Sequence, residues 1–142
     1  MWSDTLLDAE RQHLFALLFW SALSILAATV IAVTLAARRT RSPLLEHFAL
    51  QMLAWGMIFG VIASLELHGL ARRDVSGATR LEHIVWMNIG LDVGYVGVGV
   101  VLAAAGYKLT RSMAAVGAGT GLVVQGLAVL LIDLQLAALI AR

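Results

Sequence analysis

The sequence predicts an all-α integral membrane protein: a four-helix bundle of antiparallel, up-down spans joined by short loops. Apolar residues of the types AVILMFWYC make up 61 % of the 142 residues, charged residues make up only 13 %, and four long stretches hold at most one charge each. A soluble domain is usually about 25 % charged. A water-soluble fold of this size could not bury so much apolar surface, so the composition excludes one.

The composition also excludes several functional classes. The absence of cysteine leaves no disulfide, thiolate nucleophile or iron–sulfur cluster. The chain has ten basic and nine acidic residues, so it lacks the excess of positive charge that nucleic-acid-binding proteins carry. Nucleic acid is therefore not an expected partner. A mean hydropathy of +0.89 excludes disorder. No phosphate loop, dinucleotide fingerprint or nucleophile motif is present, so no catalytic residue is predicted and an enzyme is not favoured.

The four stretches are each long enough for a membrane-spanning helix, which needs about 20 mainly apolar residues. They run over Leu14–Ala37, Phe48–Leu65 (continuing through Glu66 and His68), Ile84–Tyr107 and Ser112–Ala141. The predicted spans are about 13–37, 45–69, 82–107 and 112–140, within one transmembrane domain covering residues 1–142. The connections are too short for a soluble catalytic domain, so any chemistry is expected inside the bundle or at its rims.

The ends of the predicted helices carry local signals. Residues 1–12 contain three acids, whereas a signal peptide begins basic, so the first span is not a cleavable signal. Thr5 and Asp8 have the spacing of a helix-start cap, which favours a short interfacial helix on the membrane surface, with a frayed terminus as the alternative. Pro43, the only proline, precedes Leu44 at the expected start of the second span, where its missing N–H costs nothing.

The orientation rests on one basic run. An even number of spans puts both termini on one side, here called side X, and the loops around residues 40 and 110 on side Y. Basic residues are tied at five on each side. The dense Arg38-Arg39-x-Arg41 run directly behind the first span favours side Y as cytoplasmic, with the termini on the non-cytoplasmic side.

Glycines predict where the helices pack. Lipid gives helices no hydrophobic reason to associate, so contact depends on close backbone approach and polar links. Span 3 contains the pair Gly90-xxx-Gly94 and span 4 the pair Gly117-xxx-Gly121. Spans 3 and 4 are therefore expected to form the tightest pair, as an antiparallel hairpin.

The charged residues inside the spans are all acids, Glu66, Asp92 and Asp133, while all ten Lys and Arg lie outside them. Ionisable groups at membrane depth are a functional hypothesis by default. Without a basic partner in the spans, these acids must be held protonated, accept hydrogen bonds from neutral donors, or bind a proton, metal or cationic ligand.

Helical spacing and depth predict a buried polar network. Asn88, Asp92 and Tyr95 follow one face of span 3. Placing the span centres at mid-bilayer puts Tyr95 level with Gln125, and Asn88 level with Asp133 roughly 10 Å toward side X. Glu66 is expected at that second level. The predicted buried polar network consists of Asn88, Asp92, Tyr95, Gln125, Asp133 and Glu66.

Two interpretations of this network stay open. The first is interhelical glue, with Asn88–Asp133 and Tyr95–Gln125 hydrogen bonds worth about 0.6–2 kcal/mol each. The second is a ligand or proton site, with His68, His83 and His13 at the X rim as metal ligands together with a carboxylate. Trp55 and Trp86 are expected to line the core. No cofactor is predicted; haem, quinone and metal remain alternatives, although His47 and His68 lie too far apart to share one haem iron.

Three segments resemble an uncharacterised family of small bacterial four-span membrane proteins. They are Asn88-Ile89-Gly90-Leu91-Asp92-Val93-Gly94-Tyr95, the run Gly117-x-Gly119 followed by Gln125-Gly126 and Asp133, and Trp55 in span 2. The resemblance covers roughly residues 45–137. The family often has asparagine near that tryptophan, where this chain has Gln51 and Phe59. The resemblance implies a shared fold and a bacterial source, and the expected location is a bacterial inner (cytoplasmic) membrane. It supplies no activity, because the family is a domain of unknown function.

Three functional hypotheses follow. The leading one is a non-enzymatic accessory or scaffolding subunit of a larger bacterial membrane complex, or a homo-oligomer, because the chain is small, has short loops and has glycine-flattened faces. The second is a proton-linked carrier or channel that uses Asp92, Asp133 and Glu66. The third is a protein that binds a quinone or haem-type cofactor.

Overall fold

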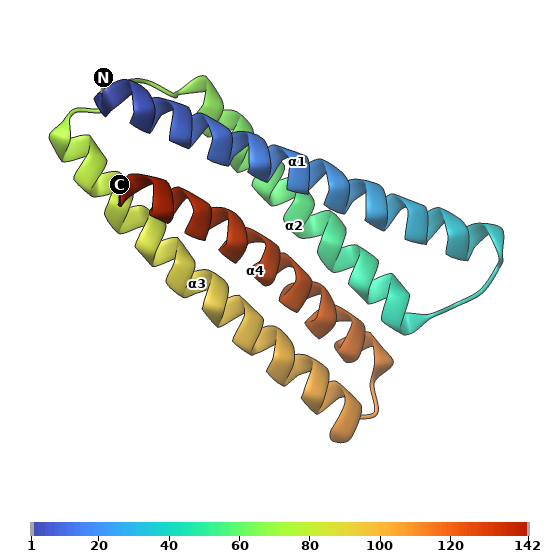
Figure 1. Ribbon diagram of the computed structural model, residues 1–142. Coiled ribbons are helices and arrows are strands. Elements are labelled where there is room, and N and C mark those ends of the chain that lie inside the picture. Colours follow the sequence, from blue (N-terminus) through green and yellow to red (C-terminus); the bar gives the residue numbers. More distant parts are fainter. Residues whose placement is uncertain (1, 142) are drawn as a thin grey trace.

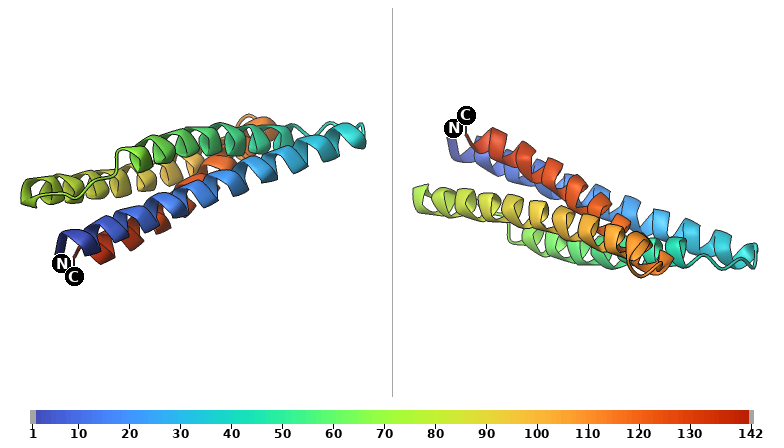
Figure 2. Two further views of the ribbon diagram at one scale, coloured as in Figure 1. Left: turned by 90° about the horizontal axis from the view of Figure 1, so that it is seen from above. Right: turned by 90° about the horizontal axis from the view of Figure 1, so that it is seen from below.

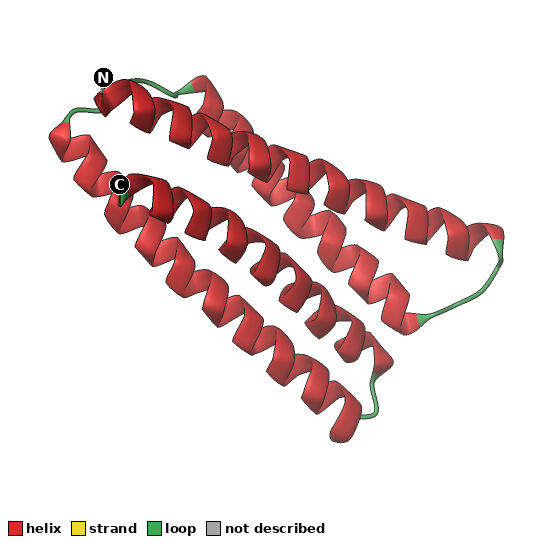
Figure 3. Cartoon of the chain, viewed as in Figure 1, coloured by secondary structure: helices red, strands yellow, loops and turns green. Residues whose placement is uncertain are grey.

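The computed structural model describes residues 2–141, and within that range the chain forms four α-helices and no strand (Figure 3). They are α1 (Trp2–Ala37), α2 (Pro43–His68), α3 (Val75–Lys108) and α4 (Met113–Ile140). All four are long and apolar enough to cross a membrane. Large apolar side chains cover the outside, Phe19 being 72 % exposed and Val101 67 %. The predicted all-α class is confirmed.

Successive helices run in opposite directions as two hairpins, and α4 occupies the central position (Figures 1 and 2). Among the described residues, the backbone of α4 approaches those of α1, α2 and α3, whereas α3 approaches α4 alone. The α3–α4 contact is the most extensive, as predicted for the second hairpin. Both ends of the described chain lie at the same end of the bundle, which is the X end (Figure 1).

Glycines on two sides of α4 allow this close packing. A Cβ placed on Gly119 would lie 2.5 Å from the Gly99 carbonyl oxygen and the Ala103 amide of α3. On its other side, α4 meets α2, where a Cβ on Gly121 would lie 2.6 Å from Gln51 Cβ. Any side chain at these positions would force the helices apart.

The predicted Gly90–Gly94 contact face is not used inside the chain. Nothing lies within 4 Å of a Cβ placed on Gly90, Gly94 or Gly97. These glycines lie on the side of α3 opposite the buried positions, which include Asp92 and Gly99. The α3–α4 contact instead uses Gly99 and Gly106, which lie further along α3.

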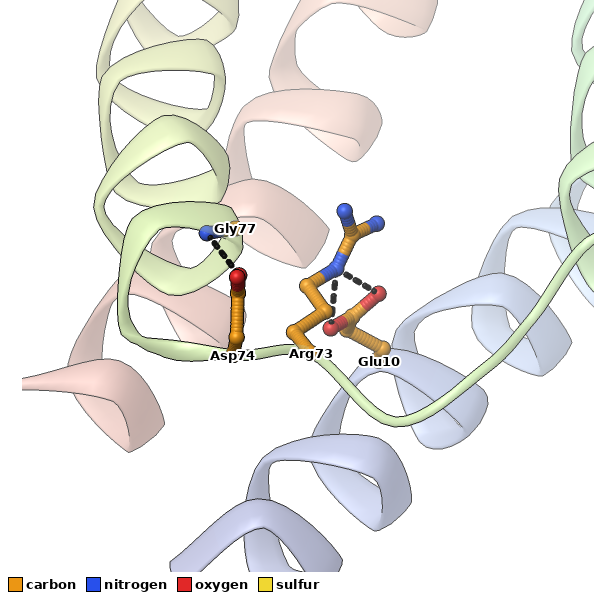
Figure 4. Close-up of polar contacts among 4 residues, drawn as sticks. All are labelled: Glu10, Arg73, Asp74 and Gly77. Atoms are coloured by element: carbon orange, nitrogen blue, oxygen red, sulfur yellow. Dashed lines mark hydrogen bonds and ion pairs between the residues drawn. The ribbon is translucent and has the colours of Figure 1, made fainter.

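Polar caps fix where the second, third and fourth helices begin. The Ser42 hydroxyl accepts from the Leu45 N–H, and the Ser112 hydroxyl from the Ala115 N–H. The Asp74 carboxylate accepts from the Gly77 N–H at 2.7 Å (Figure 4). That cap starts α3 at Val75, earlier than the predicted residue 82, because Ala78 and Leu81 pack against the ends of α1 and α4.

The segment expected as a separate interfacial helix is instead the first part of α1. Residues 2–12 continue into the span without a break. Leu6 and Ala9 are buried in a cluster with Leu81, Val85 and Leu136. This apolar contact holds the first turns of α1 in line with the bundle.

Adding one methyl group at the α3–α4 contact tests its tightness. We expect Gly119→Ala to destabilise the fold by about 1–3 kcal/mol, because the new Cβ overlaps the α3 backbone. The matched control Gly94→Ala, which meets open space, is expected to leave stability unchanged or raise it by up to about 1 kcal/mol, since alanine favours helix. The measurement is the free energy of unfolding in detergent; equal losses for both variants would contradict this packing.

The Asp74 cap predicts a pH-dependent contribution to stability. Hydrogen bonds from the Gly77 N–H and the Ser76 hydroxyl lower the pKa of Asp74 below its usual 3.8. A carboxyl with a lowered folded-state pKa stabilises the fold above its unfolded-state pKa and loses that effect as pH falls through its folded-state value. The melting temperature of the wild type should therefore exceed that of Asp74→Ala at neutral pH, with the difference closing below pH 3.8. Asp74→Asn keeps a capping group and should show no such closing.

Candidate functional site

The polar side chains gather around a pocket of about 250 Å³ at the X end of the bundle. All four helices and the α2–α3 loop contribute to its lining. Its charged and polar residues are Glu10 and His13 from α1, Glu66 from α2, Arg73 from the loop, Asn88 from α3 and Asp133 from α4. Three carboxyl groups thus face one arginine and one histidine.

The arginine is paired with one of these acids. Arg73 Nε donates to both oxygens of Glu10, at 2.7 and 2.9 Å (Figure 4). Glu10 is only 4 % exposed. The hydrogen bond to Glu10 raises the pKa of Arg73 above its usual value. Arg73 therefore balances the charge of Glu10, although it lies in the loop outside the helices.

The two aspartates lie deeper than this pair. Asp133 Oδ1 is 3.5 Å from His13 Nε2, and Asp133 is 3 % exposed. Asp92, on the neighbouring face of α3, is 4 % exposed. Among the described residues, Asp92 Oδ2 and His13 Nδ1 are buried without a hydrogen-bond partner. A buried oxygen without a hydrogen-bond partner costs free energy. Packing of the helices alone therefore does not explain why Asp92 is buried here.

Of the predicted network, Glu66, Asn88 and Asp133 do line one pocket. No hydrogen bond joins Asn88 to Asp133, and Asp133 contacts His13 instead. Asn88 is half-buried and Glu66 is exposed overall, at the edge of the pocket. The sequence therefore placed these groups at a common level without identifying their partners.

The predicted bond between Tyr95 and Gln125 is wrong. The Gln125 side chain is fully buried, accepts from Trp20 Nε1 at 2.7 Å, and donates to Ser24 Oγ at 3.1 Å. It also lies 3.3 Å from the sulfur of Met52. Gln125 therefore points toward α1 and α2 rather than toward α3. This second cluster, which joins three helices at mid-height, is an interhelical link.

The aromatic residues differ in exposure, because Trp55 and Tyr95 are half-buried whereas Trp86 is exposed. Tyr95 packs on Trp55, with ring centroids 5.1 Å apart, and Trp55 Nε1 donates to Gln51 Oε1 at 3.1 Å. The core prediction for Trp86 is wrong, since this residue is 56 % exposed. It follows the buried Val85 by one residue, and one helical step turns its side chain about 100° away from the bundle.

The predicted histidine rim does not come together. His68 is exposed, with Nδ1 2.7 Å from the Ser64 carbonyl oxygen of its own helix, and His83 is exposed on α3. Only His13 lies in the pocket. Within residues 2–141, no group of three or more His, Cys, Asp or Glu side chains has the arrangement of a metal site.

Sequence reasoning missed Glu10 and Arg73, because both fall outside the apolar stretches. A helical pattern could have revealed Glu10, since Leu6, Glu10, His13 and Leu17 recur at the spacing of one helix face. Arg73 gives no such signal, because it reaches the pocket only through the path of the α2–α3 loop.

Together, these features define a class: an all-helical bundle with four helices able to cross a membrane and an acidic pocket at one end. A model of a family of unknown function, DUF6992, matches residues 16–134. The chain belongs to this family. No curated protein and no solved structure matches it.

The Glu10–Arg73 pair generates a testable coupling. Arg73→Gln should destabilise the fold by about 1–3 kcal/mol, because it leaves a buried carboxylate without its cation. Glu10→Gln combined with Arg73→Gln should recover part of that loss, since a neutral pair no longer buries a lone charge. The measurement is a double-mutant cycle on the free energy of unfolding; strictly additive losses would contradict the pairing.

Proposed function

We propose that this chain is a small integral membrane protein that binds a proton, or a small cation, in its acidic pocket, and that it acts as a proton-linked carrier. The observation that carries the proposal is the pocket itself, a space of about 250 Å³ lined by the buried Asp133 and, at its exposed edge, by Glu66. The buried Asp92 of α3 lies close enough to Asp133 for their charges to repel. Burying carboxylates in excess of cations is costly unless they take up a proton or another positive charge.

The balance of charge in the pocket supports this proposal. Arg73 is already committed to Glu10 by two hydrogen bonds. His13 is the remaining basic group in the lining, and it contacts Asp133. Glu66 and Asp92 therefore form no ion pair within the described residues, although the charge of Arg73 also acts on Glu66. A site with this imbalance attracts positive charge more strongly than anions.

The shape of the bundle favours a carrier over an open channel. The pocket lining lies at the X end, and the fully buried Gln125 links α4 to α1 and α2 beyond it. Because that link occupies the middle of the bundle, passage to side Y requires the helices to rearrange.

The proposal predicts proton movement that depends on the buried aspartates. In vesicles containing the purified protein, an imposed pH gradient should collapse faster than in empty vesicles, as followed by an internal pH-sensitive dye. Asp133→Asn and Asp92→Asn keep the side-chain shape and remove the titratable group, so each should slow this rate about tenfold or more. The matched control Asp8→Asn alters an acid of α1 whose side chain is 66 % exposed and should have no effect.

The infrared spectrum separates binding from transport. A protonated-carboxyl band that titrates with pH in the wild type, and is lost in Asp133→Asn, would show proton binding even where no flux occurs. A wild type with neither a titrating band nor faster collapse of the gradient would overturn the proposal.

A second proposal is the accessory or scaffolding subunit, and one observation favours it. Gly90, Gly94 and Gly97 leave a flat strip on the outer side of α3, with nothing within 4 Å of the added Cβ positions. Small residues of this kind allow another transmembrane helix to approach closely. Copurification in mild detergent tests it: Gly94→Leu should release the partner or second copy, whereas Val93→Leu should not.

A further inference from the structure

At the Y end, the ribbons of α1 and α2 draw apart (Figure 1). Residues of both helices line a groove there. The groove has a volume of about 900 Å³. Small side chains of α1, including Ala28 and Ala32, form one wall, and Ala49 and Leu53 of α2 belong to the other. The hydroxyl of Thr29, which also lines the groove, donates to its own helix at Ile25, so both walls present mainly apolar surface.

The mouth of this groove is basic. Arg39 and Arg41 both line it, and both are exposed. No ion pair involves either residue within the described part of the chain, and the neighbouring Arg38 is exposed as well. One carboxylate, that of Glu46, also lines the groove and accepts from the Ser42 N–H at 3.3 Å. The mouth therefore keeps a net positive charge.

The backbone holds Arg39 at this mouth in a conformation that arginine rarely adopts. Its φ is 50°, in the left-handed region. The Arg39 N–H bonds to the Ala36 carbonyl and the Thr40 N–H to the Leu35 carbonyl, which is the pattern that ends a helix, most often with glycine at this position. An arginine here costs more than glycine would.

We propose that this groove binds one anionic phospholipid, with its phosphate held by Arg39 and Arg41 and an acyl chain lying between α1 and α2. Arginine presents a planar fork of donors that matches phosphate oxygens. Ala32 lies seven residues before Arg39, or about 10 Å along a helix, which places the apolar walls at acyl-chain depth below the headgroup. Basic pockets between transmembrane helices are a known type of anionic headgroup site.

The choice of an anionic lipid rests on two features found together. An apolar groove alone would accept any acyl chain, and exposed arginines alone would attract any anionic surface. Here the groove ends at the arginines, so one molecule can satisfy both. This proposal concerns the opposite end of the bundle from the acidic pocket and is independent of proton binding there.

The experiment measures lipid binding by the full chain in neutral detergent. The probes are phosphatidylglycerol, phosphatidylcholine with the same acyl chains, and inorganic phosphate. We expect phosphatidylglycerol to bind about tenfold or more tightly than phosphatidylcholine. Equal affinity for the two lipids would overturn the proposal, and so would competition by inorganic phosphate at the concentration at which the lipid binds, because it would indicate an anion site without an acyl chain.

Arg39→Gly is the decisive variant, because glycine adopts a positive φ without strain. Its melting temperature should equal or exceed that of the wild type, while its affinity for phosphatidylglycerol falls about tenfold. The matched control is Arg111→Gly, which replaces an arginine with a φ of 51° in the other Y-end loop. An equal loss of affinity in both variants would mean that only general surface charge matters, and would overturn the proposal.

A second variant tests the apolar wall without changing charge. Ala32→Phe narrows the groove and should weaken phosphatidylglycerol binding several-fold. The dependence of that binding on salt concentration should stay the same, because both arginines are retained. Undiminished affinity in Ala32→Phe would show that no chain lies between α1 and α2 and would overturn the acyl-chain part of the proposal.

Discussion

The close approach of α4 to its neighbours is the constraint on which the rest of this molecule depends. Gly119 and Gly126 bring it against α3, and Gly117 and Gly121 bring it against α2. Without a hydrophobic force between helices in lipid, such backbone contacts and polar links supply the cohesion. The same helix carries Asp133, so the packing that holds the bundle together also fixes the position of the deepest acid in the pocket.

The architecture could be predicted from the sequence because it follows from composition and length. Each apolar stretch forms a helix that is long and apolar enough to cross a membrane. The α3–α4 hairpin was predicted from the glycine content of both stretches, but its contact uses Gly99, Gly106, Gly119 and Gly126 rather than the pairs Gly90–Gly94 and Gly117–Gly121. The level of Asn88 and Asp133 along the bundle was also predictable, since helical rise is constant. The rotation of each helix about its own axis could not be predicted, because α3 and α4 carry glycine on several faces and can therefore pack in more than one way.

Because the rotation of the helices could not be predicted, the partners of particular side chains were predicted wrongly. Gln125 was expected to face Tyr95, but the Gly119 and Gly126 contacts turn it toward Trp20 and Ser24. The pocket was incomplete in the sequence because one of its acids, Glu10, precedes the apolar stretch and its arginine lies in a loop. Only the tertiary structure brings such groups together. No local sequence pattern predicts the path of the α2–α3 loop across the end of the bundle.

The unequal lengths of the helices have a consequence for the surrounding lipid. At 1.5 Å per residue, the 36 residues of α1 extend about 54 Å, well beyond a hydrocarbon layer of about 30 Å. The acidic pocket lies near one extremity of this long helix. In the membrane-spanning arrangement that we propose, a change of a few ångströms in bilayer thickness would move its carboxyl groups between headgroups and oil. Acyl-chain length would then tune the proton affinity of the site, which would couple its chemistry to the make-up of the host membrane.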